Sequence, residues 1–135
     1  MSSKLKPTLI VLALFATLLA ACGAPGNATA PAAANTTPIS PNTPVSFAKD
    51  VTPILQNYCL KCHGGEQTQK GLSVASYAAL MAGSQNGPVV VPGDPSTSKL
   101  ITLIQQGKMP KRGPKPTANE LQILINWVTQ GAQNN

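Results

Sequence analysis

The run Cys59-Leu60-Lys61-Cys62-His63 constrains this chain more than any other stretch of it. Two thiols separated by two residues can reach both vinyl groups along one edge of a porphyrin, and the next residue can place an imidazole nitrogen on the iron. This spacing is the attachment signature of a c-type haem. We therefore expect one covalently bound haem c, with Cys59 and Cys62 forming thioethers and His63 acting as the proximal iron ligand.

Two other kinds of site also use a Cys-x-x-Cys pair. A structural zinc site needs about four protein ligands, usually in two spaced pairs, whereas the whole chain has three cysteines and one histidine. A thioredoxin-like redox pair needs a βαβ context, and no alternation of strands and helices is visible near the motif. A chance match without chemistry is the remaining alternative, and the sequence favours haem attachment.

The first 21 residues have the pattern of an export signal. Lys4 and Lys6 precede an almost wholly apolar stretch over 9–21, which ends with two alanines directly before Cys22. A short apolar stretch with a small-residue cleavage site is typical of secretory signals, and small residues before a cysteine are typical of bacterial lipoproteins. We expect cleavage before Cys22 and lipid attachment to it. A plain signal peptide and an uncleaved anchor are alternatives, although the stretch is short for a span of about 20 residues.

These assignments use all three cysteines of the chain, one for lipid and two for haem. No thiol is left for a disulfide, although an exported chain would permit one. Export agrees with the haem motif, because bacteria attach c-type haem outside the cytoplasm. We expect an extracytoplasmic protein that its lipid holds on a membrane, on the periplasmic or cell-surface side.

Composition divides the chain into a signal peptide over 1–21, a tether over 22–45 and one folded domain over 46–132. The tether is rich in Ala, Pro, Thr and Asn without apolar periodicity, which predicts disorder. After removal of the signal, eight Lys and Arg face four Asp and Glu, a net charge of +4. The sequence has no basic helix face with interleaved aromatics, which is the pattern that would indicate nucleic-acid binding. Aromatic residues make up only 4% of the chain. A domain of this size buries little apolar surface by itself, and a bound haem would add a large apolar group to its core.

Apolar spacing predicts an all-α domain of about four helices around the haem, without a confident strand. The first helix runs from Phe47 to Tyr58, and Pro53 either follows a Thr52 cap or kinks the helix. A weaker helix follows over 73–81 and ends at Gly83, and a loop covers 86–95. The next predicted helix is capped by Ser98 and closed by Gly107. The last one opens with a capping box of Thr117 and Glu120 and ends before Gly131.

The first and last of these helices each carry an apolar face. We expect Phe47 and Val51 to pack on Leu124 and Val128 where the two helices cross. Such a contact would hold the two ends of the domain together beside the haem.

The second axial ligand decides between electron transfer and gas chemistry. His63 is the only histidine, so a second histidine of the same chain is excluded. Met1 leaves with the signal, and Met81 lies in a helical pattern that favours a core position. Met109 precedes Pro110 in a loop, where it could present its thioether to the iron; a gap-filling role near the haem edge is the alternative. Met/His ligation would close both axial positions, which favours one-electron transfer over catalysis.

Basic residues flank Met109 on both sides. If this loop rims the haem crevice, its charges could steer an acidic redox partner, at a rate that falls as salt rises. A solvated basic loop and pairing with the haem propionates are the alternatives. The residues concerned are Lys108, Lys111, Arg112 and Lys115.

The chain resembles the class I c-type cytochrome domain, and most closely its short planctomycete-type variant. The similarity covers about 46–132. It rests on Phe47, Asp50, Val51, Pro53, Ile54 and Leu55 before the haem motif, on Gly64 after it, on Gly71-Leu72, on Val91-Pro92-Gly93 with Pro95, Ser98 and Leu100, on Met109-Pro110, and on Glu120, Leu124, Trp127, Gly131 and Ala132.

This resemblance implies a cytochrome c fold in which the N- and C-terminal helices cross beside the haem. It also implies His63 and Met109 as axial ligands, and a role in electron transfer, either as a lone carrier or as a domain of a larger enzyme. One position departs from the pattern, because such domains often have a second proline where this chain has Lys111.

The leading hypothesis is therefore a membrane-tethered monohaem cytochrome c that carries electrons between extracytoplasmic redox proteins and is not an enzyme. The alternatives are an electron-accepting subunit of a dehydrogenase or oxidase complex, and an open-site haem gas sensor or peroxidase. The four acidic residues are spread along the chain without clustering, so no acid–base pair supports independent catalysis. The sequence carries no signal for an oligomeric state.

Overall fold

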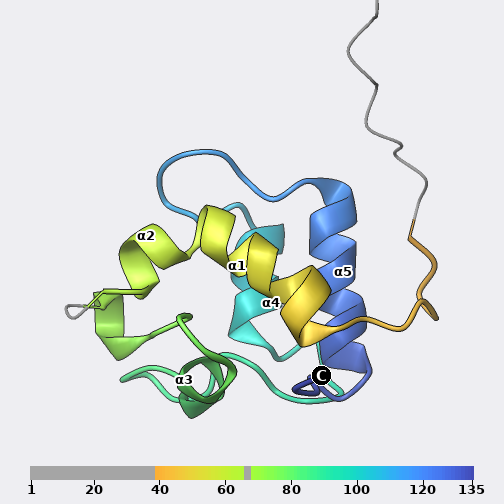
Figure 1. The fold of residues 1–135 in the computed structure, drawn as a ribbon. Helices are drawn as coiled ribbons and strands as arrows, with labels where there is room; N and C mark the ends of the chain where they lie inside the picture. The colour runs from red at the N-terminus through yellow and green to blue at the C-terminus, as the bar shows by residue number, and fades with distance from the viewer. Residues whose placement is uncertain (1–38, 66–67) are drawn as a thin grey trace, which may run out of the picture. The chain divides into compact units, whose positions relative to one another are not determined.

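The computed structural model describes residues 39–65 and 68–135, and within these ranges the only regular elements are helical (Figure 1). The predicted all-α class is thereby confirmed for this part of the chain. The count of about four helices is not, because five α-helices and two short η elements occur. They are η1 Phe47–Val51, α1 Thr52–Tyr58, α2 Leu60–His63, η2 Gln69–Gly71, α3 Tyr77–Ala82, α4 Lys99–Gln105 and α5 Ala118–Thr129.

The N-terminal predictions fall mostly outside the described residues. The signal peptide over 1–21, the lipid site at Cys22 and most of the tether over 22–45 belong to the part that the structure does not describe. Among the described residues, no helix has the length and hydropathy that a membrane crossing requires.

The first predicted helix forms, but it changes type before Pro53. Ser46 caps η1 by accepting a hydrogen bond from the backbone N–H of Lys49 at 3.3 Å. Thr52 is not an N-cap, because its backbone is helical and its hydroxyl donates to the carbonyl of Phe47 at 2.9 Å. Proline has no N–H, and its ring crowds the carbonyl four residues back. The wider π-helical turn of η1 lets the helix continue into α1 without that clash.

The weaker predicted helix also forms, as α3, but it begins later than the predicted span of 73–81. Ser76 is its N-cap and accepts a hydrogen bond from the N–H of Ala79 at 3.2 Å. The helix ends before Gly83, as predicted, and this residue has a φ of +83°. A left-handed backbone favours glycine, so the stop signal was correctly located.

Ser98 stands at the N-cap position of α4, but the predicted cap bond is wrong. Its side chain makes no bond to the helix. Instead the hydroxyl accepts from the N–H of Val91 and donates to the carbonyl of Asp94, both at 2.8 Å. Ser98 is fully buried, so it serves the preceding loop as its internal anchor. At the other end of α4, Gly107 follows with a φ of +66°, as predicted.

The predicted capping box of α5 is present in both directions. The Thr117 hydroxyl accepts from the N–H of Glu120 at 3.2 Å, and the Glu120 carboxylate accepts from the N–H of Thr117 at 2.7 Å. Gly131 lies just past the helix with a φ of +93°. Two reciprocal bonds at one end and a glycine at the other define the longest helix of the domain.

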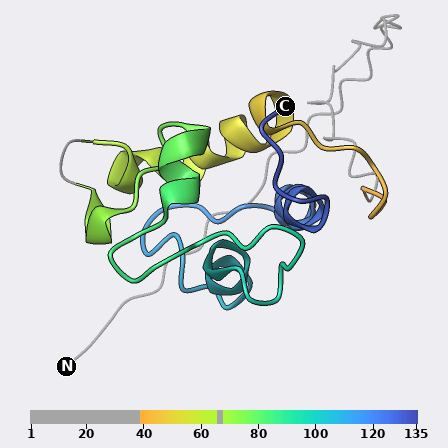
Figure 2. The same cartoon turned by 90° about the horizontal axis from the view of Figure 1, so that it is seen from below.

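The core forms where η1 packs against α5, as predicted (Figure 2). Phe47, Val51, Leu124 and Val128 are all buried in this one cluster. The ring of Phe47 also lies 5.4 Å from that of Trp127, measured between centroids. The two ends of the domain are therefore joined by the apolar packing of η1 on α5 that the sequence predicted.

Hydrogen bonds add to this junction from both sides of η1. The backbone carbonyl of Asn135 accepts from the N–H of Ala48 at 3.0 Å, and its side-chain oxygen accepts from the N–H of Phe47 at 2.8 Å. These two N–H groups have no partner within the first helical turn. Residue Asn135 thus caps the start of the helix from the far end of the sequence.

The segment before η1 lies along α5. Asn126 donates from its side chain to the carbonyl of Ser40 at 2.8 Å, and Gln130 donates to the carbonyl of Thr43 at 2.8 Å. Gln130 also accepts from the N–H of Val45 at 3.0 Å. These side chains hold the last residues of the predicted tether against α5.

Candidate haem-binding site

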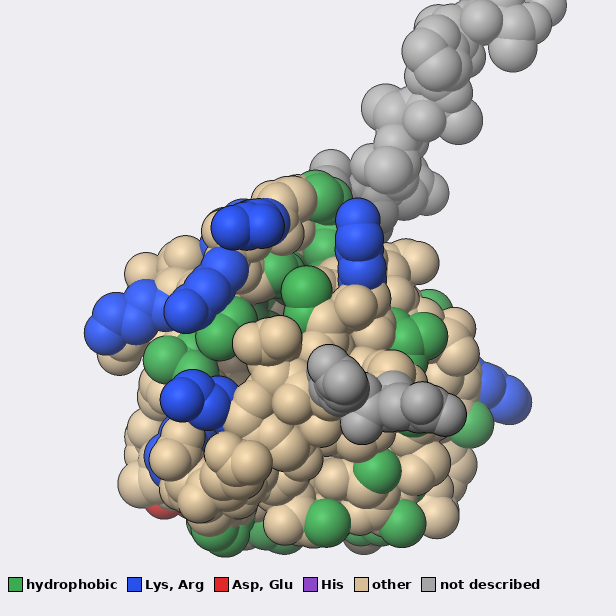
Figure 3. Space-filling model, turned by 90° about the vertical axis from the view of Figure 1, so that its left-hand side faces the viewer, with side chains coloured by type: hydrophobic (Ala, Val, Ile, Leu, Met, Phe, Trp, Pro, Cys, Tyr) green, Lys and Arg blue, Asp and Glu red, His purple; other side chains and the backbone are tan. Residues whose placement is uncertain are grey.

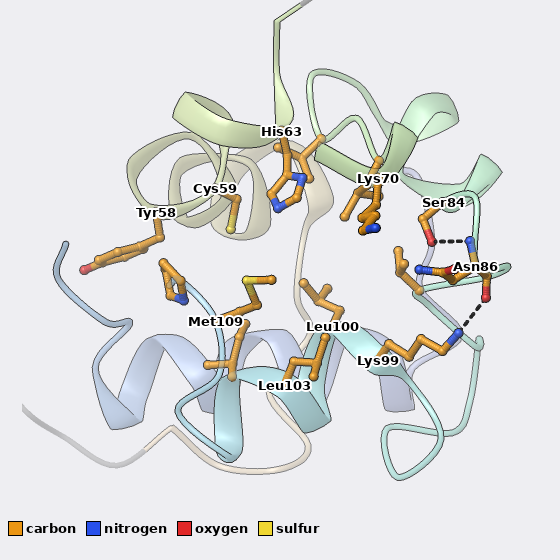
Figure 4. A pocket seen from close by; sticks show the side chains of 15 residues that line it. Tyr58, Cys59, His63, Lys70, Ser84, Asn86, Lys99, Leu100, Leu103 and Met109 are labelled. Carbon is orange, nitrogen blue, oxygen red and sulfur yellow. Dashed lines mark hydrogen bonds between the residues drawn. The ribbon is translucent and has the colours of Figure 1, made fainter. Parts of the chain in front are cut away.

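A cleft lies between the α1–α2 junction and α4 with the loop that follows it. About 960 Å³ in it is free of protein atoms, part of this space being open to solvent. Apolar side chains form most of the lining, and three residues with possible roles as haem attachment or iron ligands reach it (Figure 4). The lining consists of Tyr58, Cys59, His63, Lys70, Leu72, Val74, Ser84, Asn86, Val89, Lys99, Leu100, Leu103, Ile104, Met109 and Pro110.

The haem motif sits at the junction of two helices. Cys59 ends α1 and precedes α2, and its N–H donates to the carbonyl of Leu55 at 2.9 Å. His63 is the last residue of α2, and its carbonyl accepts from the N–H of Val74 at 2.7 Å. This bond ties the motif to the chain that forms the next part of the wall. The side chains of Cys59 and His63 consequently reach the same cleft from one side (Figure 4).

Gly64 permits the tight exit from this motif. A Cβ at this position would lie 2.7 Å from the carbonyl oxygen of Leu60 and closer still to its side chain. Since real Cβ atoms do not approach a backbone oxygen so closely, any larger residue would displace the end of α2. Gly64 therefore helps to hold His63 in place.

Met109 faces His63 from the opposite wall (Figure 4). Its position follows from the end of α4, where the N–H groups of Lys108 and Met109 both donate to the carbonyl of Leu103, at 2.9 and 3.0 Å. The ammonium of Lys115 holds the loop from the other side, donating to the carbonyl of Gly107 at 3.0 Å and to that of Pro110. The loop is thus fastened at both ends around the methionine.

The residues of the cleft fit a haem. The imidazole of His63 reaches the cleft from the side that carries Cys59, and Met109 lies on the opposite wall (Figure 4). An imidazole on one wall, a thioether on the other and apolar side chains between them match the needs of an iron porphyrin. This is the donor set that the sequence predicted for the two axial positions.

The two cysteines differ in their surroundings. Cys59 is half-buried and lines the cleft, and burial, followed by the nearby Cys62, raises its thiol pKa to about 11. Cys62 is exposed and is absent from the cleft lining. The structure therefore brings together Cys59, His63 and Met109 of the four predicted residues, and leaves the side chain of Cys62 outside.

The basic residues that flank Met109 do not line the cleft, although Met109 and Pro110 do. Lys108, Lys111 and Arg112 are exposed, and none of them is part of the lining. Lys115 bonds to its own loop, as described above. The face shown in Figure 3 nevertheless carries several Lys and Arg side chains and almost no acidic one.

Several lining residues were missed by the sequence analysis. Lys70 and Lys99 reach the cleft together with Asn86, although no periodicity or motif distinguishes these positions. Tyr58, predicted only as part of a helix face, forms one end of the cleft, and its hydroxyl donates to Glu120 at 3.0 Å. Only folding brings these residues of four separate segments together.

The Tyr58–Glu120 hydrogen bond changes the titration of both groups. The bond to Glu120, with burial second, raises the pKa of Tyr58. Burial alone would raise the pKa of Glu120, but hydrogen bonds from Thr117 and Tyr58 outweigh it and lower that pKa. The carboxylate is therefore held ionised and the phenol protonated, which is the state in which their bond forms.

The remaining aromatic side chains and Met81 lie away from the cleft. Tyr77 donates to the carbonyl of Ala132 at 3.0 Å, and the indole of Trp127 donates to the carbonyl of Gln133 at 2.9 Å. Met81 packs against the core, as its helical pattern indicated. These side chains support the η1–α5 contact.

Comparison with known families agrees with these observations. Residues 59–113 match the family model described as Planctomycete cytochrome C. The matched segment begins with the haem motif and extends through Met109, so it includes both walls of the cleft. No curated protein and no solved structure matched the chain.

Proposed function

We propose that this chain, in which residues 59–113 belong to a planctomycete-type cytochrome c domain, carries single electrons by means of one haem c held between His63 and Met109. A cytochrome c domain implies haem binding and electron transfer. The observation that carries the finer proposal is the placement of an imidazole and a thioether on opposite walls of an apolar cleft. When bound, the haem iron would supply an Fe(III)/Fe(II) couple.

The residues of the motif would attach and orient the cofactor. The thiols of Cys59 and Cys62 would each add across one vinyl double bond, with sulfur bonding to one carbon and the hydrogen going to the other. For Cys62 this requires its side chain to turn toward the cleft from its exposed position. His63 supplies the proximal nitrogen, and the bond from Val74 to its carbonyl fixes the backbone that carries it.

The rest of the cleft keeps the site closed and rigid. Apolar residues of α4 and of the chain after η2, such as Leu72, Leu100 and Leu103, line the space between the walls and would pack against the faces of the haem. The bonds of Lys115 keep the methionine loop in one shape. If His63 and Met109 hold the haem from the two walls, the site would need little rearrangement when the iron changes charge, which would suit a carrier rather than an enzyme.

We test the ligand assignment with the visible spectrum of the ferric, haem-matured protein. The red-region charge-transfer band of methionine-bound iron should be present, and Met109→Ala should abolish it. Met81→Ala is the matched control, because Met81 packs on the core outside the cleft, and it should keep the band. A high-spin spectrum that Met109→Ala leaves unchanged, with ready binding of carbon monoxide after reduction, would contradict the proposal and indicate an open site.

Covalent attachment has its own test. Denatured wild-type protein should retain haem through acid–acetone extraction, whereas the double variant Cys59→Ser, Cys62→Ser should lose it. If Cys59→Ser and Cys62→Ser each retain haem, the remaining thiol of each variant forms a thioether by itself. Complete extraction from the wild type would contradict the attachment.

The location of the protein is also a proposal. Export and lipid attachment at Cys22 rest on the N-terminal sequence pattern and would place the domain on the outer side of a membrane. Cys22→Ala should move the protein from the membrane fraction to the soluble extracytoplasmic fraction. Equal membrane association of the two forms would overturn the lipid anchor.

The proposed partners are extracytoplasmic redox proteins with acidic docking surfaces. Support comes from the exposed positions of Lys108, Lys111 and Arg112 beside the methionine loop. Electron exchange with a carboxylate-coated electrode, which mimics an acidic surface, should slow as salt rises. Lys111→Glu should slow it at low salt, whereas Lys49→Glu, an exposed change on η1, should have a smaller effect. Equal effects of the two changes would contradict docking through this loop.

A further inference from the structure

The two ends of the cleft differ in chemistry. Tyr58 and Cys59 form one end, and the other is lined by Lys70, Asn86 and Lys99 (Figure 4). No Asp or Glu is among the described residues that line the cleft, and Glu66 lies outside the described part of the chain. Among the described residues, two cations thus border an apolar space at the end away from Cys59.

Lys70 is held in an unusual backbone conformation. Its φ of +58° is left-handed, a conformation that is uncommon for residues other than glycine. The carbonyl of Lys70 accepts from the N–H of Gln85 at 2.9 Å, which ties the turn at η2 to the turn at 84–87. The side chain that this turn carries is one of those that line the cleft (Figure 4).

Lys99 approaches the same end of the cleft from α4. Its ammonium donates to the backbone carbonyl of Asn86 at 2.7 Å, and the N–H of Asn86 in turn donates to the hydroxyl of Ser84 at 3.2 Å. This contact uses one of the three ammonium hydrogens, so further donors remain for an anion. The turn at 84–87 therefore brings the two lysines to one place, from η2 and from α4.

We propose that Lys70 and Lys99 bind the propionate carboxylates of the haem. This inference rests on the proposed function. A haem carries its two propionates at the edge away from the vinyl groups, and the vinyl edge is fixed by the cysteines of the motif. The carboxylates then reach the end of the cleft where the two ammonium groups lie. Lysine and carboxylate form charge-assisted hydrogen bonds, which are stronger than neutral ones.

The proposal assigns the propionates to different cations from those that the sequence suggested. The basic residues around Met109 do not line the cleft, and Lys115 bonds to its own loop. The residues that do line it come from η2 and α4. The loop cations remain exposed for another role, such as docking.

Lys70→Met and Lys99→Met test the assignment, because each removes the charge and keeps most of the side-chain length. In resonance Raman spectra of the haem-matured protein, the propionate bending bands shift when hydrogen bonds to the propionates are lost. We expect a shift in each variant and a larger one in the double variant. The reduction potential should also fall in each, because a nearby positive charge favours the Fe(II) state.

Lys49→Met is the control, since Lys49 is an exposed lysine of η1 that does not line the cleft. It removes the same charge and should leave the propionate bands unchanged. Lys70→Gly is a second variant that keeps the left-handed backbone without strain, so its band shift should match that of Lys70→Met. Bands in all cleft variants that coincide with those of Lys49→Met would overturn the assignment.

The outcomes separate the two proposals. A wild type with methionine-bound haem but unshifted bands in the cleft variants overturns the propionate assignment and leaves electron transfer intact. A wild type without attached haem overturns both. A shift in only one lysine variant supports that lysine and removes the other from the proposal.

Discussion

The η1–α5 contact and the haem-binding cleft bury apolar side chains in different ways. At the contact, Val51, Leu124 and Val128 are fully buried, Trp127 is 1% exposed, and the indole N–H of Trp127 has a carbonyl partner. In the cleft, Leu103 and Met109 are only half-buried. The chain completes the first region by itself, whereas the cleft keeps about 960 Å³ free of protein atoms, a space that the proposed haem would fill.

The scarce aromatic residues follow the same division. Phe47 packs edge-on against Tyr77, with ring centroids 5.2 Å apart, and lies near Trp127 on its other side. Only Tyr58 of the described aromatic residues lines the cleft. The small domain thus uses its large side chains to close the junction of its two ends and leaves the cleft for the cofactor.

The largest expected loss of stability comes from truncating a side chain in the η1–α5 contact. Trp127→Ala should lower the free energy of unfolding by roughly 3–5 kcal/mol, because it leaves a large cavity in a closed core. Leu103→Ala, a change in the cleft wall, should cost less in the chain produced without haem and more once haem is attached. Urea unfolding of both variants in both forms measures this. Equal cost of the two changes in the haem-free chain would remove the distinction.

A second test concerns the buried hydroxyl that organises the loop before α4. Ser98→Ala leaves the N–H of Val91 without its side-chain partner. A buried group left unsatisfied costs roughly 1–3 kcal/mol, and this loss should appear in urea unfolding with or without haem. The matched change Ser96→Ala removes an exposed hydroxyl and should cost less. If Ser98→Ala were neutral, the hydroxyl would not be anchoring the loop.

A third change tests the capping box at the start of α5. Thr117→Ala should lower stability by about 1 kcal/mol, since it removes the acceptor for the N–H of Glu120. Thr117→Ser keeps an acceptor and should recover most of the loss. The same measurement on a helix interior threonine, Thr102→Ala, serves as a comparison without a cap. A loss that serine does not recover would point to packing instead.

The smallest expected effects appear in acid. The folded pKa of Glu120 is lowered, so its contribution to stability is present above its unfolded pKa of about 4.3 and is lost as the pH falls through the lower folded value. Hydrogen bonds from Ser96 and Thr97 lower the pKa of Asp94 to about 2, so its contribution is lost between about pH 4 and about pH 2. Stability should therefore decline as the pH falls from about 4 toward about 2, with contributions from both carboxylates.

Two variants assign this decline to its carboxylates. Glu120→Gln and Asp94→Asn should each reduce the loss of stability in acid, and the double variant should reduce it more than either. Glu120 also joins the two regions, because it accepts from Tyr58 in the cleft and caps α5. Tyr58→Phe should therefore reduce the contribution of Glu120 to this decline without abolishing it, because the hydrogen bonds from Thr117 remain. An acid profile that none of these variants changes would contradict the assignments.

Helix ends could be located from the sequence because their causes are local. The capping box of Thr117 and Glu120 acts within one turn, and Gly83 and Gly107 take the left-handed backbone that ends a helix. The predicted cap by Ser98 was wrong for the opposite reason. Its hydroxyl had two kinds of partner available, and packing of the 91–94 loop against the helix start decided between them.

The site was predictable only in part. The five-residue motif over 59–63 predicted haem attachment, and a loop methionine was proposed as the second ligand. The fold brings Cys59, His63 and Met109 to one cleft. The exposed position of Cys62 could not be inferred from spacing, and neither could the arrival of Lys70 and Lys99 at the far end. Those placements depend on contacts between segments that no short-range pattern encodes.

By itself the sequence determined the chemistry that the chain can offer and the local turns of its helices, because a motif and a cap each act over a few bonds. Only the tertiary structure decided which groups meet. Asn135 reaches the N–H groups of the first helix, and the turn at 84–87 carries Lys70 and Lys99 to one end of the cleft. Such meetings are set by how buried apolar faces pack, since that packing fixes the positions of residues far apart in the chain.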